Sequence, residues 1–233
     1  EADAFSCAEL PRGYLEGSTL QPLKVAVGVD VLSSMGLGIG FSLGSERREA
    51  YRMMLFCMAV PKVYFCSLFG LNICQEDWPS QGLPSCYITD RGPGAVLKLI
   101  EEFDDEFPIR ELALAYAGQS KATVESSNPR KRKTEGKPAY CKSKFTPVKL
   151  ARKLIWEFIK RNRTRWIEDK IEVIPEMAFV SPDPLSFWNS YDSRGRNDAQ
   201  MMSIDNAVRS FLTPKKFSLK EDGVYLLGRK FNS

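Results

Sequence analysis

Residues 23–43 have the sequence LKVAVGVDVLSSMGLGIGFSL, in which two apolar runs flank a pair of serines. The first run, at 23–32, is rich in valine and too short for a helix with flanking turns, which is typical of a buried strand. The second run, at 36–43, has the same character. Because the link through Ser33 and Ser34 is so short, we expect two antiparallel neighbouring strands.

Further strands and helices are predicted on both sides of this pair. We expect strands at 2–10, 86–89 and 109–115, and helices at 45–60, at 95–103, from about 120 and from 146. Residues 61–85 are expected to be irregular. The buried side of the helix at 45–60 is predicted from its apolar residues, which are Ala50, Met53, Met54, Cys57 and Met58. In the helix from Thr146 the corresponding residues are Ala151, Leu154, Ile155, Phe158 and Ile159. This order of elements predicts an α/β protein with a mixed sheet.

The charge is unevenly distributed. The 233 residues carry a net charge of +4, but residues 128–170 hold 15 Lys and Arg against 4 Asp and Glu, a local charge of +11. Such a block is either a solvated helix and loop or a surface for a polyanion, most simply nucleic acid. The chain has no histidine, which excludes histidine metal sites, Ser-His-Asp triads and Cys-His dyads within it.

Two further compositional features bear on location. No run approaches the roughly 20 apolar residues of a membrane helix, so we expect no membrane association. The six cysteines form no Cys-x-x-Cys pair, and we expect reduced, buried thiols in a cytoplasmic protein.

Three carboxylates are candidates for a metal site. Asp90 ends the apolar run of CYITDRGPG, residues 86–94, where Gly92 and Gly94 let the backbone turn away and leave room beside it. Asp3 lies on the first expected strand and Glu125 on the helix that begins near residue 120. Carboxylates that converge at one sheet edge suit Mg²⁺ or Mn²⁺, and two such ions can activate a nucleophile against a phosphodiester.

Several stretches resemble the DDE transposases and retroviral integrases, whose catalytic core has the ribonuclease H fold, and most closely their TnsB and Mu-transposase branch. They are ADAF at 2–5, VGVDVLSSMGLGIGFSL at 27–43, DWPSQGLPSCYITDRG at 77–92, QSKATVES at 119–126, SPDPLSFW at 181–188 and FLTPKKFSLKEDGVYLLGRKF at 211–231. The separation of Asp90 and Glu125 is close to that of the family's D,D-35-E motif. Phe5, Ser34 and Ala122 depart from the usual Thr, Arg and Gly.

The resemblance implies a polynucleotidyl transferase in which Asp3, Asp90 and Glu125 bind two Mg²⁺ or Mn²⁺ ions. Its reactions would be cleavage at transposon ends and strand transfer into target DNA. It implies a ribonuclease H-like integrase core at 1–170, a linker at 171–203 and, at 204–233, the beginning of a Mu-transposase-type β-barrel that is cut short. It also implies assembly as a homo-oligomer on DNA, an ATP-dependent target-selection partner, and a nucleoid-associated protein of bacterial or phage origin.

Some residues keep more than one interpretation. Asp30 is the rival of Asp3 for the first carboxylate, although the family's hydrophobic-Asp-x-x-Ser pattern is structural. Lys121, one helical turn before Glu125, is either a phosphate contact or a solvated lysine. A DNA-binding wall is predicted from the basic run that follows, which contains Arg130, Lys131, Arg132, Lys133 and Lys137, with Lys142 and Lys144. The tryptophans Trp78, Trp156, Trp166 and Trp188 are expected to serve in packing.

Two alternatives to a transposase core remain open. One is a transposase-derived DNA-binding or assembly module that keeps the fold without the chemistry. The other is a ribonuclease H-like nuclease that cuts DNA without joining it. Divalent-metal binding distinguishes the transposase core from the module without chemistry. Analysis of nicked and joined products distinguishes it from the nuclease.

Overall fold

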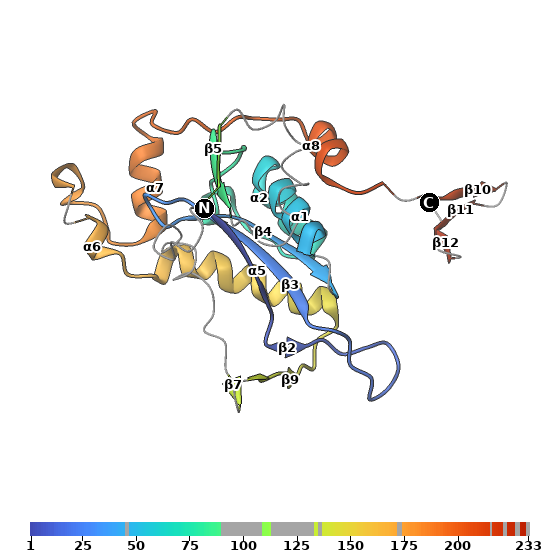
Figure 1. The fold of residues 1–233 in the computed structure, drawn as a ribbon. Coiled ribbons are helices and arrows are strands. Elements are labelled where there is room, and N and C mark those ends of the chain that lie inside the picture. The colour runs from blue at the N-terminus through green and yellow to red at the C-terminus, as the bar shows by residue number, and fades with distance from the viewer. Residues whose placement is uncertain are drawn as a thin grey trace.

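The central element of the chain is a three-stranded antiparallel sheet (Figure 1). The computed structural model describes residues 1–44, 47–89, 109–112, 133–134, 137–171, 174–214, 216–220, 223–226 and 229–231. The sheet has the order β1–β3–β4, formed by Ala2–Ser6, Leu23–Val29 and Gly36–Leu43. The predicted antiparallel pair is thus confirmed, with Val25 opposite Phe41.

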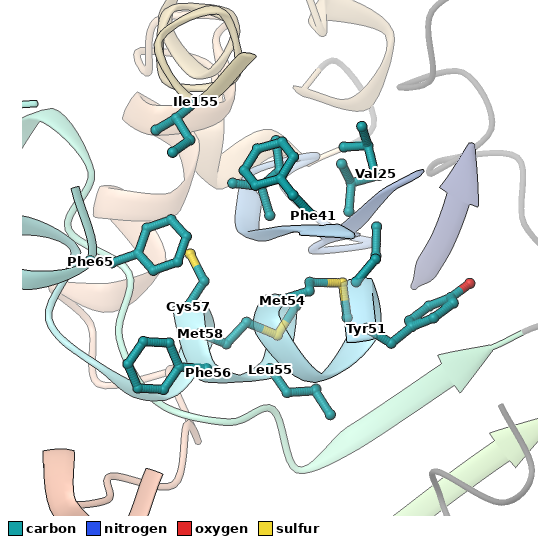
Figure 2. Close-up of a cluster of buried hydrophobic side chains, with 14 of the residues drawn as sticks. Val25, Phe41, Tyr51, Met54, Leu55, Phe56, Cys57, Met58, Phe65 and Ile155 are labelled. Atoms are coloured by element: carbon teal, nitrogen blue, oxygen red, sulfur yellow. The ribbon is translucent and has the colours of Figure 1, made fainter. Parts of the chain in front are cut away.

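Helices cover both faces of this sheet. Helix α1 (Arg47–Ala59) lies against β3 and β4, and helix α5 (Pro147–Thr164) lies against β4 from the other side. Figure 2 shows Tyr51 and Met54 on one side of the strands, and Phe41 on the other side with Ile155. The predicted apolar stripes of both helices form this core, and the predicted start of α5 is confirmed by its N-cap, Thr146.

Two strands from the middle of the chain extend the structure beside β1. Strand β5 (Cys86–Thr89) pairs in parallel with β6 (Ile109–Leu112), and β5 contacts β1. The predicted strand at 86–89 is confirmed. The chain is therefore a mixed α/β structure in the part that is described. The helices expected at 95–103 and from about residue 120 lie outside the described residues.

Short strands connect the basic segment to the start of the chain. Strand β2 (Glu9–Leu10) pairs in parallel with β9 (Cys141–Lys142). Strands β7 (Lys133–Thr134) and β8 (Lys137–Pro138) form a small antiparallel pair. The strand expected over residues 2–10 is therefore divided, because β1 ends at Ser6 and the chain changes partner.

The expectation of an irregular segment at 61–85 is wrong in part. Helix α2 (Lys62–Leu68) and the short 3-10 helix η1 (Gln75–Asp77) lie within it. Trp78 and Leu83 are almost fully buried, so the stretch that follows η1 is packed into the core rather than exposed as a surface loop. The sequence signal was weak because α2 is short and its first residue is a lysine.

Residues 171–203, expected as a linker, contain a packed helix. The segment holds the end of α6 (Glu168–Ile171), the 3-10 helix η3 (Pro175–Met177) and α7 (Pro184–Asp192). Leu185 and Phe187 of α7 are buried, and Leu83 forms a bridge with Gln200. The segment is therefore folded against the rest of the chain, while the domain limits remain a prediction.

The last part of the chain begins with a helix. Helix α8 (Ile204–Phe211) contacts α1, and Ala207 and Phe211 are fully buried. Strands β10 (Ser218–Lys220), β11 (Gly223–Leu226) and β12 (Arg229–Phe231) then form an antiparallel meander. The β-barrel expected at 204–233 remains a prediction. Among the described residues, no helix has the length and apolar character needed to cross a membrane.

Candidate functional site

Asp3 lies on the face of the sheet that α5 covers. Opposite residues of an antiparallel pair point to the same face, and successive residues alternate. Asp3 is opposite Val27, and the next residue of β3, Gly28, faces α1, because a Cβ placed there would meet Met58. The partly buried Asp3 carboxylate is therefore on the side of the sheet away from α1.

The strand next to β1 leads directly to the second predicted carboxylate. Strand β5 contacts β1 and ends at Thr89, so Asp90 is the next residue of the chain. Asp90 and Glu125 lie outside the described residues, as does Lys121. The structure thus places Asp3 and the strand that precedes Asp90 together. The predicted convergence of the three carboxylates remains a prediction.

Asp30, the rival first carboxylate, closes the turn between β3 and β4. Its Oδ2 accepts hydrogen bonds from the backbone N–H and the hydroxyl of Ser33, both at 2.6 Å. The backbone N–H of Ser34 donates to the Asp30 carbonyl at 3.0 Å, and Ser34 has a left-handed backbone with φ of 59°. These bonds give the Asp-x-x-Ser pattern a local structural role, as the sequence predicted.

No cluster of three or more metal-ligating side chains occurs among the described residues. Asp3 is the predicted ligand that falls within them, and the other two carboxylates are outside. The donor type fits a hard cation, because carboxylates are the acidic oxygen ligands that Mg²⁺ prefers and the chain offers no histidine.

The basic segment is attached to the chain close to β1. Lys153 of α5 donates to Oε1 of Glu9 at 2.5 Å, and the Ser143 hydroxyl donates to Oε2 of Glu9 at 2.7 Å. The hydrogen bond from Lys153 holds the pKa of the Glu9 carboxyl below its usual range, and the same bond raises the pKa of Lys153. Glu9 follows Asp3 by only six residues.

The predicted DNA-binding residues are only partly described. Lys133 and Lys137 lie on the two strands of the β7–β8 pair, whereas Arg130, Lys131 and Arg132 lie outside the described residues. Lys142 and Lys144 are exposed just before α5. The structure therefore places Lys133 and Lys137 on one antiparallel pair of strands, and the DNA-binding wall remains a prediction.

The tryptophan prediction is right for two residues and wrong for two. Trp78 is fully buried, and Trp188 packs against the main hydrophobic cluster. Trp156 and Trp166 are 53% and 68% exposed. Trp156 is exposed because α5 turns its opposite side to the sheet, and the Trp166 indole N–H donates to the Glu168 carboxylate at 2.8 Å.

Lys62 is a buried charge that sequence analysis did not anticipate. Its Nζ donates to the carbonyl oxygens of Cys57 and Met58, at 2.8 and 3.3 Å, and lies 5.2 Å from the ring centre of Trp78. Burial lowers the pKa of Lys62 to about 8. The lysine thus satisfies carbonyl groups at the carboxyl end of α1, where a helix leaves them without partners.

Asn162 connects α5 to the sheet on the other side. Its Oδ1 accepts from the backbone N–H of Gly36 at 2.9 Å, and the Trp78 indole N–H donates to the carbonyl of Gly36 at 2.7 Å. Phe158 packs over the same glycine, because a Cβ there would lie 2.4 Å from its ring. These contacts fix the position of α5 relative to β4, and therefore relative to Asp3.

A comparison with known protein families shows which family the chain belongs to. A sequence model of the TnsB C-terminal domain matches residues 15–133, which are 119 of the 233 residues. The chain belongs to the TnsB C-terminal domain family. The predicted relationship to TnsB-type transposases is thereby confirmed.

The family match covers part of the predicted site. It includes Asp90 and Glu125 and the basic run up to Lys133, whereas Asp3 precedes it and Lys137 follows it. No curated protein matched the chain.

Proposed function

We propose that this chain is the catalytic core of a DDE transposase, which cleaves transposon ends and joins them to target DNA. The observation that carries the proposal is the position of Asp3, on the α5 face of β1, beside the strand that ends just before Asp90. Membership in the TnsB C-terminal domain family supports a transposase and DNA as its ligand.

The arrangement of elements supports a ribonuclease H-like core. Such a core has three antiparallel strands, a parallel pair beside the first of them, and helices on both faces. The order β1–β3–β4 with β5 and β6 adjacent, and with α1 and α5 on opposite faces, agrees with it. A carboxylate on β1 and one after β5 would then share one edge of the sheet.

In the proposed site Asp3, Asp90 and Glu125 would hold two Mg²⁺ or Mn²⁺ ions. Such ions activate a water or a 3′-hydroxyl and stabilise the leaving oxygen of a phosphodiester. The chain's own contribution is to fix the carboxylates: β1 is paired along its length with β3, and α5 is held to β4 through Asn162. Basic residues of 128–170 would bind the DNA backbone.

The test is a strand-transfer assay with a pre-cut DNA end, a plasmid target and Mg²⁺, in which joined and nicked products are separated. We expect Asp3→Asn to lower joining by about 1,000-fold or more, since loss of a metal ligand costs several kcal/mol in the transition state. Asp30→Asn is the matched control and should keep joining within about tenfold, because an amide oxygen can still accept from Ser33.

Three results would contradict the proposal. Joining by Asp3→Asn at the wild-type rate would exclude Asp3 as a ligand. Nicked products without joined ones would favour a nuclease. DNA binding without any metal-dependent reaction in the wild type would favour an inactive assembly module.

A further inference from the structure

Helix α5 carries a row of long side chains on the face that points away from the sheet. The row consists of Lys149, Lys153, Trp156, Lys160 and Arg163, which we call the α5 row. Its spacings of four, three, four and three residues put all five on one side of an α-helix. The buried residues Ala151, Ile155, Ile159 and Asn162 occupy the opposite side. The row extends over about 21 Å at 1.5 Å per residue.

The centre of the α5 row is an exposed indole. Trp156 is 53% exposed and belongs to neither hydrophobic cluster of the described residues. Lys153 lies one turn before it and Lys160 one turn after it. An exposed aromatic ring between cations is the combination that single-stranded nucleic acid binds, with phosphates at the cations and bases stacked on the ring.

The four cations of the α5 row form two groups, one with acidic partners and one without them among the described residues. Lys153 is bound to Glu9, and Arg163 is bound to Asp77 at 2.7 Å. Lys149 and Lys160 are exposed, and neither has an ion-pair partner in the part of the chain that the structure describes. These two lysines flank Trp156 at about 10 and 6 Å along the helix axis. They are the cations available for phosphate groups.

We propose that the α5 row binds an unpaired stretch of DNA, with phosphates at Lys149 and Lys160 and one base stacked on Trp156. The inference rests on the proposed function, which makes DNA the ligand, and adds the form of DNA and the surface. Unpaired DNA is favoured because the bases of an intact duplex are already stacked and offer no free face to the indole. A symmetric contact with a second copy is disfavoured because it would bring identical cations together.

The test compares two DNA probes by fluorescence anisotropy: a blunt-ended duplex of two separate strands, and the same duplex with a single-stranded tail. We expect the wild-type chain to bind the tailed probe about tenfold more tightly, which is the size of one stacked base. Trp156→Ala should remove this preference and leave binding of the blunt-ended duplex unaffected. The double variant Lys149→Gln/Lys160→Gln should weaken binding of the tailed probe and reduce the salt dependence of that binding.

Matched controls come from elsewhere on the surface. Trp166→Ala removes another exposed indole, and the double substitution of Arg209 and Lys216 by Gln removes two exposed cations outside α5. Both controls should keep the preference for the tailed probe. Unchanged thermal melting of each variant would show that the fold is intact.

Several outcomes would overturn the inference, and they are distinct from failure of the proposed function. Equal binding of both probes by the wild type, or equal effects of Trp156→Ala and Trp166→Ala, would overturn it while leaving DNA joining possible. A dimer in sedimentation that Trp156→Ala dissolves, with DNA binding unchanged, would assign the row to a second copy instead. Absence of any DNA binding would overturn both proposals.

Discussion

The α1 face of the central sheet is lined by glycines, whereas the α5 face carries large side chains and a carboxylate. A Cβ added at Gly28, Gly38 or Gly40 would point to α1. Because these residues have no side chain, the helix approaches the strands closely. On the other face Val25, Phe41 and their neighbours hold α5 at the distance of a side-chain layer (Figure 2). A closely packed face tolerates little change, and a face with a side-chain layer has room for a polar side chain such as that of Asp3.

The strongest test of this contrast is Gly40→Ala on the α1 face. The added Cβ would lie 2.0 Å from the carbonyl oxygen of Ala50 and 2.3 Å from the backbone N of Met54. Since backbone atoms cannot move aside cheaply, we expect a loss of about 3 kcal/mol in the free energy of unfolding, measured by urea denaturation.

Gly28→Ala is the control for that substitution. Its Cβ would meet the flexible end of Met58 at 1.9 Å, which can adopt another rotamer, and the Met54 sulfur at an ordinary contact distance of 3.4 Å. We expect a loss of about 1 kcal/mol. If the two variants lose the same stability, or if Gly40→Ala is neutral, the α1 face is not closed by backbone contact as described.

The second test concerns the end of α1, where Lys62 is buried. Its pKa of about 8 in the folded chain is below the ordinary 10.5, so the unfolded chain holds more protons between these values. Stability from this group should therefore rise with pH from about 8 to 10.5. We expect wild type to gain about 2 kcal/mol relative to Lys62→Met between pH 7.5 and 9.5, measured by urea denaturation at both values.

The comparison of wild type with Lys62→Met is needed because neighbouring thiols oppose this effect. Burial raises the pKa of Cys57 to about 11 and that of Cys66 to about 12, which costs stability as the pH rises above about 9. Both chains keep these cysteines, so the cost of burying the thiols cancels in the difference, which leaves the lysine and its attraction to the thiolates. A constant difference between wild type and Lys62→Met across this pH range would show that Lys62 titrates normally.

The parts of the fold that could be predicted from the sequence are those that depend on residues close together in the chain. The β3–β4 pair and the buried stripe of α5 depend on local patterns of apolar residues, and both were predicted. The role of Asp30 was also local, since its partner Ser33 is three residues away. Such features need no knowledge of how distant segments pack.

The features that were missed depend on contacts between distant segments. Helix α2 is short and begins with a lysine whose burial depends on carbonyl groups of α1 and on Trp78. Trp156 was expected to pack, but its exposure is set by the side of α5 that meets β4. For the candidate site, the sequence supplied Asp3 and the strand before Asp90, and only the tertiary contact between β1 and β5 brought them together.

The smallest expected effect is on the α5 side, where Lys153 is bound to Glu9. Lys153→Met should lower the free energy of unfolding by about 0.5 kcal/mol at pH 7, because the pair is partly exposed and screened by solvent. Glu9 has a lowered pKa, so its stabilisation is present above its ordinary pKa and is lost as the pH falls through the folded value. The difference between wild type and variant should therefore shrink in acid.

Lys160→Met is the matched control for this pair, since Lys160 is on the same helix and has no ion-pair partner among the described residues. It should change the free energy of unfolding by less than about 0.3 kcal/mol at either pH. An equal loss in both variants would mean that the charge of the helix, rather than the Glu9 contact, is what stabilises the chain. A loss confined to Lys153→Met would show that the contact with Glu9, rather than the general charge of α5, contributes to holding this helix in place.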